Sequence, residues 1–146
     1  MFHKILLVLD ASLDNSRTIS LAMGLARSGG ASLTALCITG PEGGSVLGDE
    51  WISCQRALDR FFRYMKEEKD REALQLLDQV RRKGHEHGLY VDTIHETGDH
   101  GCIIQSIFSN YRPFDVVVLP GKMPLDIKKL LRKLPCPLFI TPEKKV

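Results

Sequence analysis

The residues most able to do chemistry are an acid behind the first apolar run and an acid–imidazole pair further along. Asp10 directly follows Ile5 to Leu9, and Asp99 and His100 follow a glycine. A carboxylate at the end of a strand can accept hydrogen bonds from a ligand or coordinate a metal, and it equally often stabilises a turn or caps a helix. A carboxylate beside an imidazole could do acid–base work. The sequence places no nucleophile beside this pair, so we predict no catalytic residue.

Two further groups resemble metal or redox sites only at first sight. His85 and His87 are two residues apart, whereas helical zinc ligands are four apart, and the glycines beside them indicate a solvated helix end. The cysteines are dispersed without a CxxC pair, which argues against zinc and thioredoxin-type motifs. They are Cys37, Cys54, Cys102 and Cys136. We predict no metal site and interpret the cysteines as reduced and mostly buried.

Length and composition indicate one ordinary globular domain. The chain has 146 residues, of which 43% are hydrophobic and 26% charged, both normal for a folded domain. No apolar run approaches the roughly 18–20 residues of a membrane span. The first ten residues lack the apolar core and cleavage site of a signal peptide. We therefore expect a cytoplasmic protein with no membrane partner.

Charge is balanced overall but uneven along the chain. The sequence has 20 basic and 18 acidic residues, and the segment 121–146 carries seven basic residues against two acidic ones. Such a segment could attract an anion or a nucleic acid, or could be one solvated helix face with a frayed tail. No aromatic residue interleaves with these lysines, so we expect no nucleic-acid partner. Lys122, with Lys128 and Lys129, could hold an anion before the last helix.

Apolar periodicity alternates between strand and helix. Continuous or alternating apolar runs predict strands at 5–9, 31–38, 89–95, 114–119 and 138–140. Helical spacing predicts helices from about 16 to 29, over 102–111 and over 124–134, the last opened by Pro124. The stretch from 50 to 88 reads either as one protruding helix or as two. In it, Phe61, Phe62 and Met65 fit a core or subunit-contact stripe.

This order predicts an α/β fold with a doubly wound, five-stranded parallel sheet and helices on both faces. Ligands of such sheets bind beyond the carboxyl ends of the strands. In this sequence those ends contain Asp10, Thr39, Gly98 and Gly121, which are our candidate binding residues together with Cys37 and Lys122.

Four stretches resemble the universal stress protein family and occur in its order. They are Lys4 to Ser12, Ala31 to Leu36, Phe114 to Leu119, and Pro135-Cys-Pro137. The resemblance covers essentially the whole chain and implies a single domain, 1–146, with strand order 3-2-1-4-5. It also implies a homodimer that pairs through the last strand, here Pro137 to Thr141.

The resemblance further implies where a nucleotide would bind. Family members that bind nucleotides place an Asp at the position of Asp10 and read adenine with the backbone that corresponds to Cys37 to Thr39. They hold phosphates with a Gly-x2-Gly-x9-Gly-Ser/Thr loop. This chain has Gly121 and then departs, with Pro124 at the second glycine and Leu134-Pro135 at the final pair. A proline donates no N–H to a phosphate.

Three functions stay open at this point. A non-enzymatic regulatory or stress-response domain without an ATP site fits the departing loop best. The alternative is a module that binds ATP, AMP or adenosine through Asp10 and the strand ends. A nucleotide hydrolase ranks last, because no Ser or Thr follows a glycine loop to hold Mg²⁺. No cofactor is therefore expected, although ATP or AMP is possible.

Overall fold

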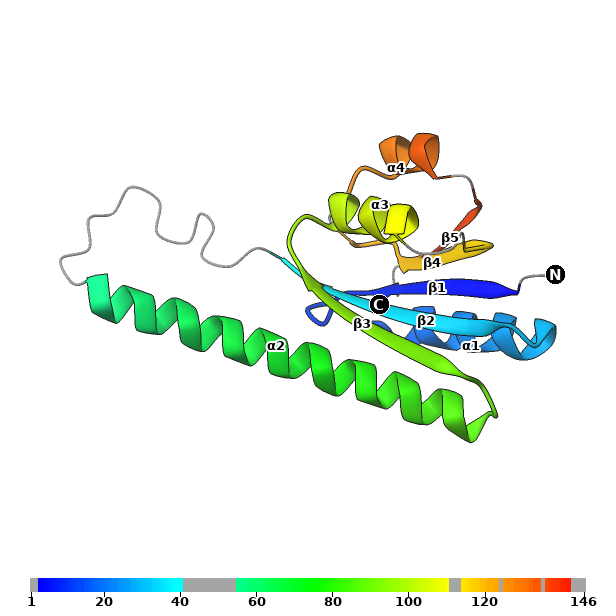
Figure 1. Cartoon of the computed structure of the whole chain (residues 1–146), viewed down its shortest axis with the longest axis horizontal. Helices are drawn as coiled ribbons and strands as arrows, with labels where there is room; N and C mark the ends of the chain where they lie inside the picture. Colours follow the sequence, from blue (N-terminus) through cyan, green and yellow to red (C-terminus); the bar gives the residue numbers. More distant parts are fainter. Residues whose placement is uncertain (1–2, 41–54, 111–113, 124, 135, 143–146) are drawn as a thin grey trace.

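The structure, a computed structural model, alternates strands and helices along the whole chain (Figure 1). It describes residues 3–40, 55–110, 114–123, 125–134 and 136–142. The first half of the chain contains β1 (Lys4–Leu9), α1 (Ser16–Gly29), β2 (Ser32–Thr39) and α2 (Gln55–Glu86). The second half contains β3 (Val91–Thr97), α3 (His100–Asn110), β4 (Val116–Pro120), α4 (Ile127–Lys133) and β5 (Leu138–Thr141).

All five strands are parallel and lie in the order β3-β2-β1-β4-β5. The predicted fold class and strand order are therefore confirmed. The chain first adds strands on one side of β1 and then returns to add β4 and β5 on the other. The switch in direction lies between the carboxyl ends of β1 and β4, where open α/β sheets bind ligands.

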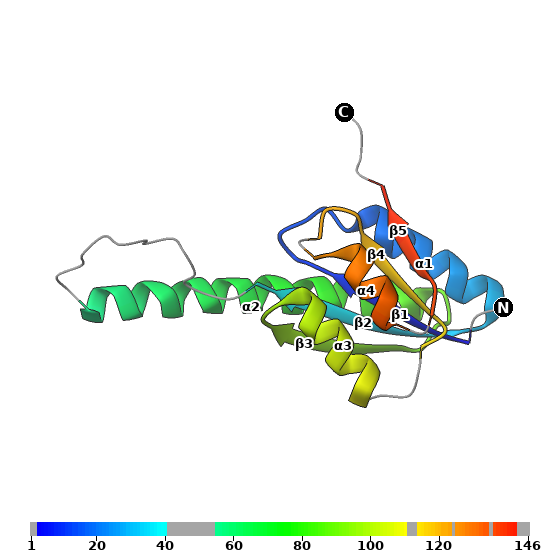
Figure 2. The ribbon, with the colours of Figure 1, turned by 90° about the horizontal axis from the view of Figure 1, so that it is seen from above.

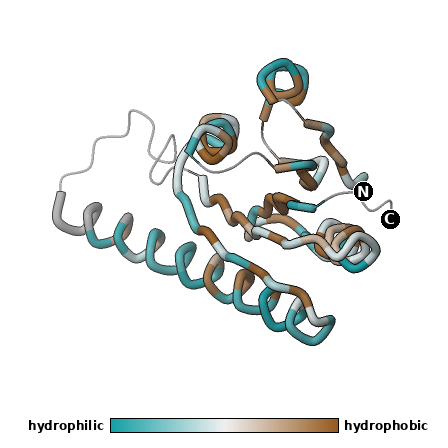
Figure 3. The backbone as a smooth tube through the Cα atoms, turned by 45° about the vertical axis from the view of Figure 1, so that its right-hand side comes forward, coloured by the Kyte–Doolittle hydropathy of each residue, from teal (hydrophilic) through white to brown (hydrophobic). Residues whose placement is uncertain are grey.

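α1 and α2 cover one face of the sheet, and α3 and α4 cover the other (Figures 1 and 2). Alternate residues of β1 explain this arrangement, since successive side chains of a strand point to opposite faces. Ile5 and Leu7 pack with α1 and α2, whereas Leu6 and Val8 pack with α3 and α4. Hydropathy follows the same pattern: the sheet is largely hydrophobic, and α2 is mainly hydrophilic except where it meets the sheet (Figure 3).

Helix ends are fixed by local sequence. Gly30 adopts a left-handed φ of 63° and closes α1 by donating its N–H to the carbonyl of Ala26, a role for which glycine is preferred. The Asp126 side chain accepts the N–H of Lys129 and caps α4. This helix begins at Ile127, so it is shorter than the predicted 124–134 and is opened by Asp126 rather than by Pro124, which lies outside the described residues.

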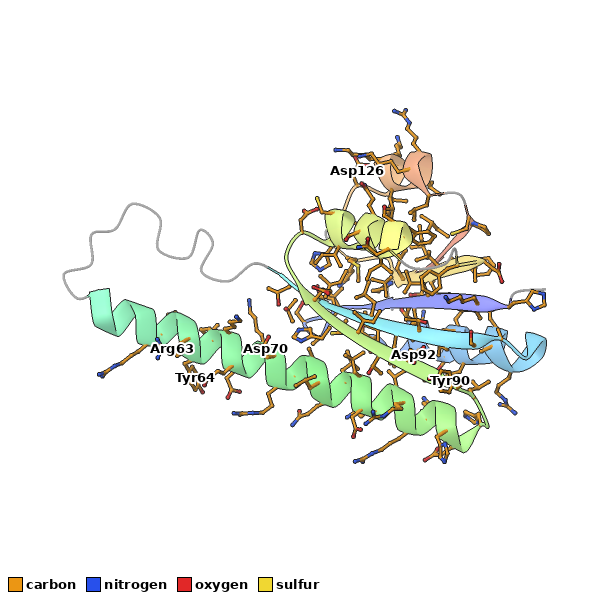
Figure 4. The ribbon with its side chains drawn as sticks, in the orientation of Figure 1. Arg63, Tyr64, Asp70, Tyr90, Asp92 and Asp126 are labelled. Atoms are coloured by element: carbon orange, nitrogen blue, oxygen red, sulfur yellow. The ribbon has the colours of Figure 1, made fainter. Side chains whose placement is uncertain are left out.

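The stretch after β2 contains one long helix, which decides between the two interpretations left open above. Only the C-terminal part of α2 packs on the sheet, through Ala73, Leu77 and Val80. The remainder extends past the sheet and carries Arg63 and Tyr64 (Figure 4). Phe61 is 46% exposed and Met65 is 36% exposed, so they do not form a core stripe, and the alternative of a subunit-contact stripe stays a prediction. The side chains of residues 55–59 and 62 lie outside the description.

None of the described helices is long and apolar enough to cross a membrane.

Candidate functional site at the carboxyl edge of the sheet

Asp10 lies at the switch point with its own chain bound to both carboxylate oxygens. The N–H and the hydroxyl of Ser12 donate to Oδ1 at 2.9 and 2.6 Å. Nε2 of His100, the first residue of α3, lies 2.9 Å from Oδ2. Both side chains of this pair are more than nine-tenths buried. The carboxylate predicted to meet a ligand is therefore engaged by two residues of the protein itself.

The loop that holds Asp10 is fixed by Asn15. The Asn15 side chain accepts the N–H of Asp10 at 3.3 Å and donates to the carbonyls of Asp10 and Leu13 at 2.8 and 3.0 Å. Asn15 precedes α1 but makes no capping bond to the helix. Its amide instead closes the turn after β1, so the direction of the Asp10 side chain is set by a hydrogen-bonded loop.

The order of these groups excludes a nucleophilic relay. In hydrolases the imidazole lies between the nucleophile and the carboxylate, so that it can take the nucleophile's proton. In this site the carboxylate of Asp10 lies between the Ser12 hydroxyl and His100. The Ser12 proton already points at a carboxylate, which holds it in place. The arrangement can fix a turn and a helix end, but it does not activate Ser12.

The neighbouring residues Asp99 and His100 do not form the pair considered from the sequence. The Asp99 carboxylate is exposed and accepts the N–H of Cys102 at 3.0 Å, which caps the start of α3. His100 turns inward to Asp10 instead. Sequence reasoning missed this pairing because β2 separates β1 from β3 in the sheet. Only the return of α3 across the sheet brings its first residue close to Asp10.

Charge at Asp10 is stabilised despite burial. Burial raises the pKa of the carboxyl, but hydrogen bonds from His100 and Ser12 outweigh that effect and hold the pKa below its usual 3.8. Asp10 is therefore ionised near neutral pH, and Nε2 of His100 donates its N–H to the carboxylate. A carboxylate with both oxygens bound by donors is a structural anion rather than a general base.

This lowered pKa makes stability depend on pH in one direction. Between the folded and unfolded pKa values, the carboxyl binds a proton only in the unfolded chain, so lowering the pH favours unfolding. We expect the Asp10 contribution to be complete above the unfolded value of 3.8 and to disappear as the pH falls through the folded pKa. Urea unfolding from neutral pH to about pH 2 measures it. An Asp10→Asn variant should show a flatter pH dependence, and an unchanged slope would contradict this account.

The ends of β2 and β3 are bonded to each other. Gly98 donates its N–H to the carbonyl of Thr39 at 2.9 Å. The Thr39 hydroxyl lies 2.8 Å from that of Thr97 and 3.3 Å from Nε2 of His95. Cys37 is fully buried, and desolvation raises its pKa to about 12. Among the three residues predicted here, the polar groups of Thr39 and Gly98 serve the sheet, and Cys37 is an inert core thiol.

The end of β5 explains why residue 121, directly after β4, is a glycine. Gly121 donates its N–H to the carbonyl of Thr141 at 2.9 Å, and a Cβ at this position would lie 2.9 Å from the same oxygen. Glycine is therefore needed for the close approach of β5, independently of any phosphate. The prolines expected to interrupt the phosphate loop, 124 and 135, lie outside the described residues.

Lys122 borders a small cleft on the α1 side of this edge. The cleft has a volume of about 230 Å³, and its lining includes Arg17, Gly121 and Thr141. Lys129 lines a different cleft, between α3 and α4, together with Asp99. The structure thus does not place Lys122 and Lys129 around one anion site. It brings Arg17, which sequence reasoning overlooked, to the same cleft as Lys122.

The described part of the chain contains neither an arranged set of metal ligands nor a thiol with a lowered pKa. No group of three or more His, Cys, Asp or Glu side chains in it is arranged to hold a metal ion. Cys37 is buried, Cys136 is partly buried, and Cys102 is exposed, contrary to the prediction of mostly buried thiols. Cys54 lies outside the described residues. The hydrogen bond that the Cys102 thiol donates to the Asp99 carboxylate raises the pKa of Cys102, which makes it a poor nucleophile.

Comparisons with known proteins identify the architecture. No family model and no curated protein matches the sequence. Solved structures do match over nearly the full length. One, from the universal stress protein family of Burkholderia pseudomallei, is 20% identical with a TM-score of 0.66 and 96% coverage of both chains.

Two further neighbours were solved with nucleotides. A family protein from Arabidopsis thaliana with AMP bound is 16% identical with a TM-score of 0.63, covering 97% of this chain and 92% of that one. A universal stress protein in complex with cAMP is 12% identical with a TM-score of 0.63, covering 96% of this chain and 97% of that one. Together with the strand order 3-2-1-4-5, these likenesses show that the chain has the fold of the universal stress proteins.

Proposed function

We propose that this chain is a non-enzymatic regulatory or stress-response domain that does not bind ATP in the manner of nucleotide-binding universal stress proteins. The observation that carries the proposal is the engagement of both Asp10 oxygens by Ser12 and His100. To bind Asp10, a ribose hydroxyl would have to displace the imidazole of His100. The buried Nε2–H would then have no hydrogen-bond acceptor, and leaving a buried donor unsatisfied costs free energy.

The other strand ends support the same function. An adenine reader at the end of β2 would need a backbone group that is not already bonded, yet the Thr39 carbonyl accepts the N–H of Gly98. The Ser12 hydroxyl cannot attack a substrate while it donates to Asp10. The Thr39 carbonyl and the Ser12 hydroxyl thus already have partners within the protein.

A homodimer through the last strand is part of this proposal. β5 lies at the edge of the sheet, and Ile140 on it is 38% exposed. Exposed edges of this kind pair readily with another strand. We propose that residues 137–141 of two copies pair at this edge. We also propose that the resulting dimer acts by binding a protein partner.

The second candidate function is a nucleotide-binding module. Its support is the pair of neighbours solved with AMP and cAMP and the cleft that joins Arg17 to Lys122. Two cations beside the switch point would suit a phosphate. This function requires the His100 side chain to leave Asp10 on binding.

Native mass spectrometry with ATP, AMP and adenosine added in turn distinguishes the regulatory domain without an ATP site from the nucleotide-binding module. We expect a dimer that takes up none of the three ligands at concentrations up to millimolar. Saturable uptake of one nucleotide per subunit would overturn the first proposal and establish the second. A monomer at micromolar concentration would contradict pairing through β5.

A further inference from the structure

An open groove separates the two helices on one face of the sheet. Helices that pack on each other lie about 8–10 Å apart, but between the start of α1 and the C-terminal half of α2 a groove of about 430 Å³ remains. Its floor is apolar and is formed by Ala11, Leu13, Ile19, Leu76 and Val80. The groove lies on the α1 and α2 side of the sheet, whereas His100 reaches Asp10 from the α3 side. It is therefore a different opening from the Asp10–His100 pair, although Asn15, whose side chain fixes the Asp10 loop, also lines it.

The α2 wall of the groove consists of long polar side chains. Apolar side chains at these positions would pack against α1 and close the groove. The polar side chains follow one another at steps of three, four and four residues, which places them on one helix face. None of them makes a hydrogen bond or an ion pair with another residue in the described ranges. They are Glu72, Gln75, Gln79 and Lys83.

Other charges of α2 behave differently. Glu68 pairs with Arg71 at 2.7 Å, and Asp78 pairs with Arg81 at 2.9 Å. Ion pairs along the helix therefore satisfy some of the charges that point away from the groove. The four polar side chains of the α2 wall keep their donors and acceptors available, whereas Asp14, Asn15 and Ser16 on the α1 side are bonded within their own loop. An apolar floor with a few available polar groups is typical of a binding site.

The charges of the groove are separated along its length. Carboxylates of Asp14 and Glu72 border it towards the start of α1, and Lys83 lies eleven residues further along α2 than Glu72. At 1.5 Å per residue the two ends of the α2 wall are about 16 Å apart. Simple anions and simple cations each meet a charge of their own sign, and among the described residues no aromatic ring lines the groove to stack on a sugar.

We propose that this groove binds a short zwitterionic peptide of about four residues in an extended conformation. Four extended residues span about 14 Å, which matches the separation of the charged ends. The peptide ammonium lies at Glu72, and its carboxylate lies at Lys83. The side-chain amides of Gln75 and Gln79 each offer a donor and an acceptor, as a peptide backbone requires, and small apolar side chains cover the floor.

Amide chemical-shift perturbation of the ¹⁵N-labelled protein with tetraalanine tests the proposal. We expect saturable shifts confined to the residues that line the groove. Glu72→Lys and Lys83→Glu should each weaken binding by about threefold to tenfold, since each replaces an exposed attraction with a repulsion. The double variant Glu72→Lys/Lys83→Glu should recover binding, because the peptide then binds in the reverse direction. Glu67→Lys, an equal charge change on α2 away from the groove, should leave the affinity unchanged.

Three results would overturn the proposal. The first is the absence of groove shifts at millimolar tetraalanine. The second is equal binding of a tetraalanine whose two ends are blocked, because the groove would then take an internal segment of a protein. The third is equal weakening by Glu67→Lys and Glu72→Lys, which would indicate a non-specific charge effect. None of these outcomes depends on whether nucleotides bind at Asp10.

Discussion

Replacing Asp10 by alanine is expected to lower the free energy of unfolding by about 3–5 kcal/mol, because it removes several hydrogen bonds to a buried carboxylate, and hydrogen bonds to charged groups contribute about 1.5–3 kcal/mol each. The variant leaves the His100 imidazole buried without its acceptor and removes both bonds from Ser12. Urea unfolding at neutral pH, followed by circular dichroism, measures the change. The loss should be among the largest for any polar residue of the chain.

A matched control and a double-mutant cycle separate the cost of losing the Asp10 hydrogen bonds from the effect of losing any negative charge. Asp126→Ala removes an exposed helix cap and should cost only about 1 kcal/mol. Asp10→Ala and His100→Ala should interact by at least about 1 kcal/mol, because residues in contact do not add independently. An Asp10→Ala cost no larger than that of Asp126→Ala, or simple additivity with His100→Ala, would contradict the proposed pair.

Replacing Gly98 by alanine is expected to cost about 1–3 kcal/mol through backbone strain. Gly98 has a φ of 143°, which L residues rarely adopt, although the space around a Cβ there is sufficient. The backbone must hold this conformation to place its N–H on the carbonyl of Thr39. Thermal unfolding measures the change, and the end of β3 should lose protection from hydrogen exchange at the same time.

The chain offers a matched glycine for comparison. Gly24 lies in the middle of α1, with nothing within 4 Å of an added Cβ. Gly24→Ala should therefore raise stability by up to about 1 kcal/mol, the difference in helix propensity. If Gly98→Ala were tolerated as well as Gly24→Ala, the positive φ of Gly98 would not be needed for its hydrogen bond to Thr39, and this prediction would be wrong.

The sheet could be predicted from the sequence because its central strands are apolar on both faces. The run from Ile5 to Leu9 and the run around Val116 to Leu119 have no polar interruption, as strands covered by helices require. The strand order came from the family resemblance and is confirmed by the structure. β3 was predicted less accurately: it lies at Val91–Thr97, two residues beyond the predicted 89–95, because a half-exposed strand imposes less pattern on its residues than a buried one. The other edge strand, β5, lies at Leu138–Thr141, within one residue of the predicted 138–140.

The long helix shows where a local pattern is insufficient. The apolar stripe of Phe61 and Met65 has the spacing of a core face, yet the sheet ends before it reaches them. Spacing reports which residues share a helix face, but the length of the neighbouring strands decides whether that face is covered.

The candidate site could be predicted only in part, for a similar reason. Asp10 and Gly121 follow strands and lie at the expected edge, but their partners come from segments remote in sequence. His100 is 90 residues from Asp10, and Thr141 approaches Gly121 only because β5 pairs with β4. Sequence order shows where polar groups end a strand, and the crossovers decide which of them meet.

The imidazole of His100 offers the most direct test that the protein itself occupies this edge. A long-range ¹H–¹⁵N spectrum of the histidine side chains, recorded with and without millimolar ATP, reports on the Nε2 hydrogen bond to Asp10. We predict a protonated Nε2 whose signals shift in Asp10→Asn and do not respond to ATP. A His100 signal that moves saturably with ATP, towards that of the Asp10→Asn variant, would mean that the nucleotide displaces the imidazole, and the proposed function would be wrong.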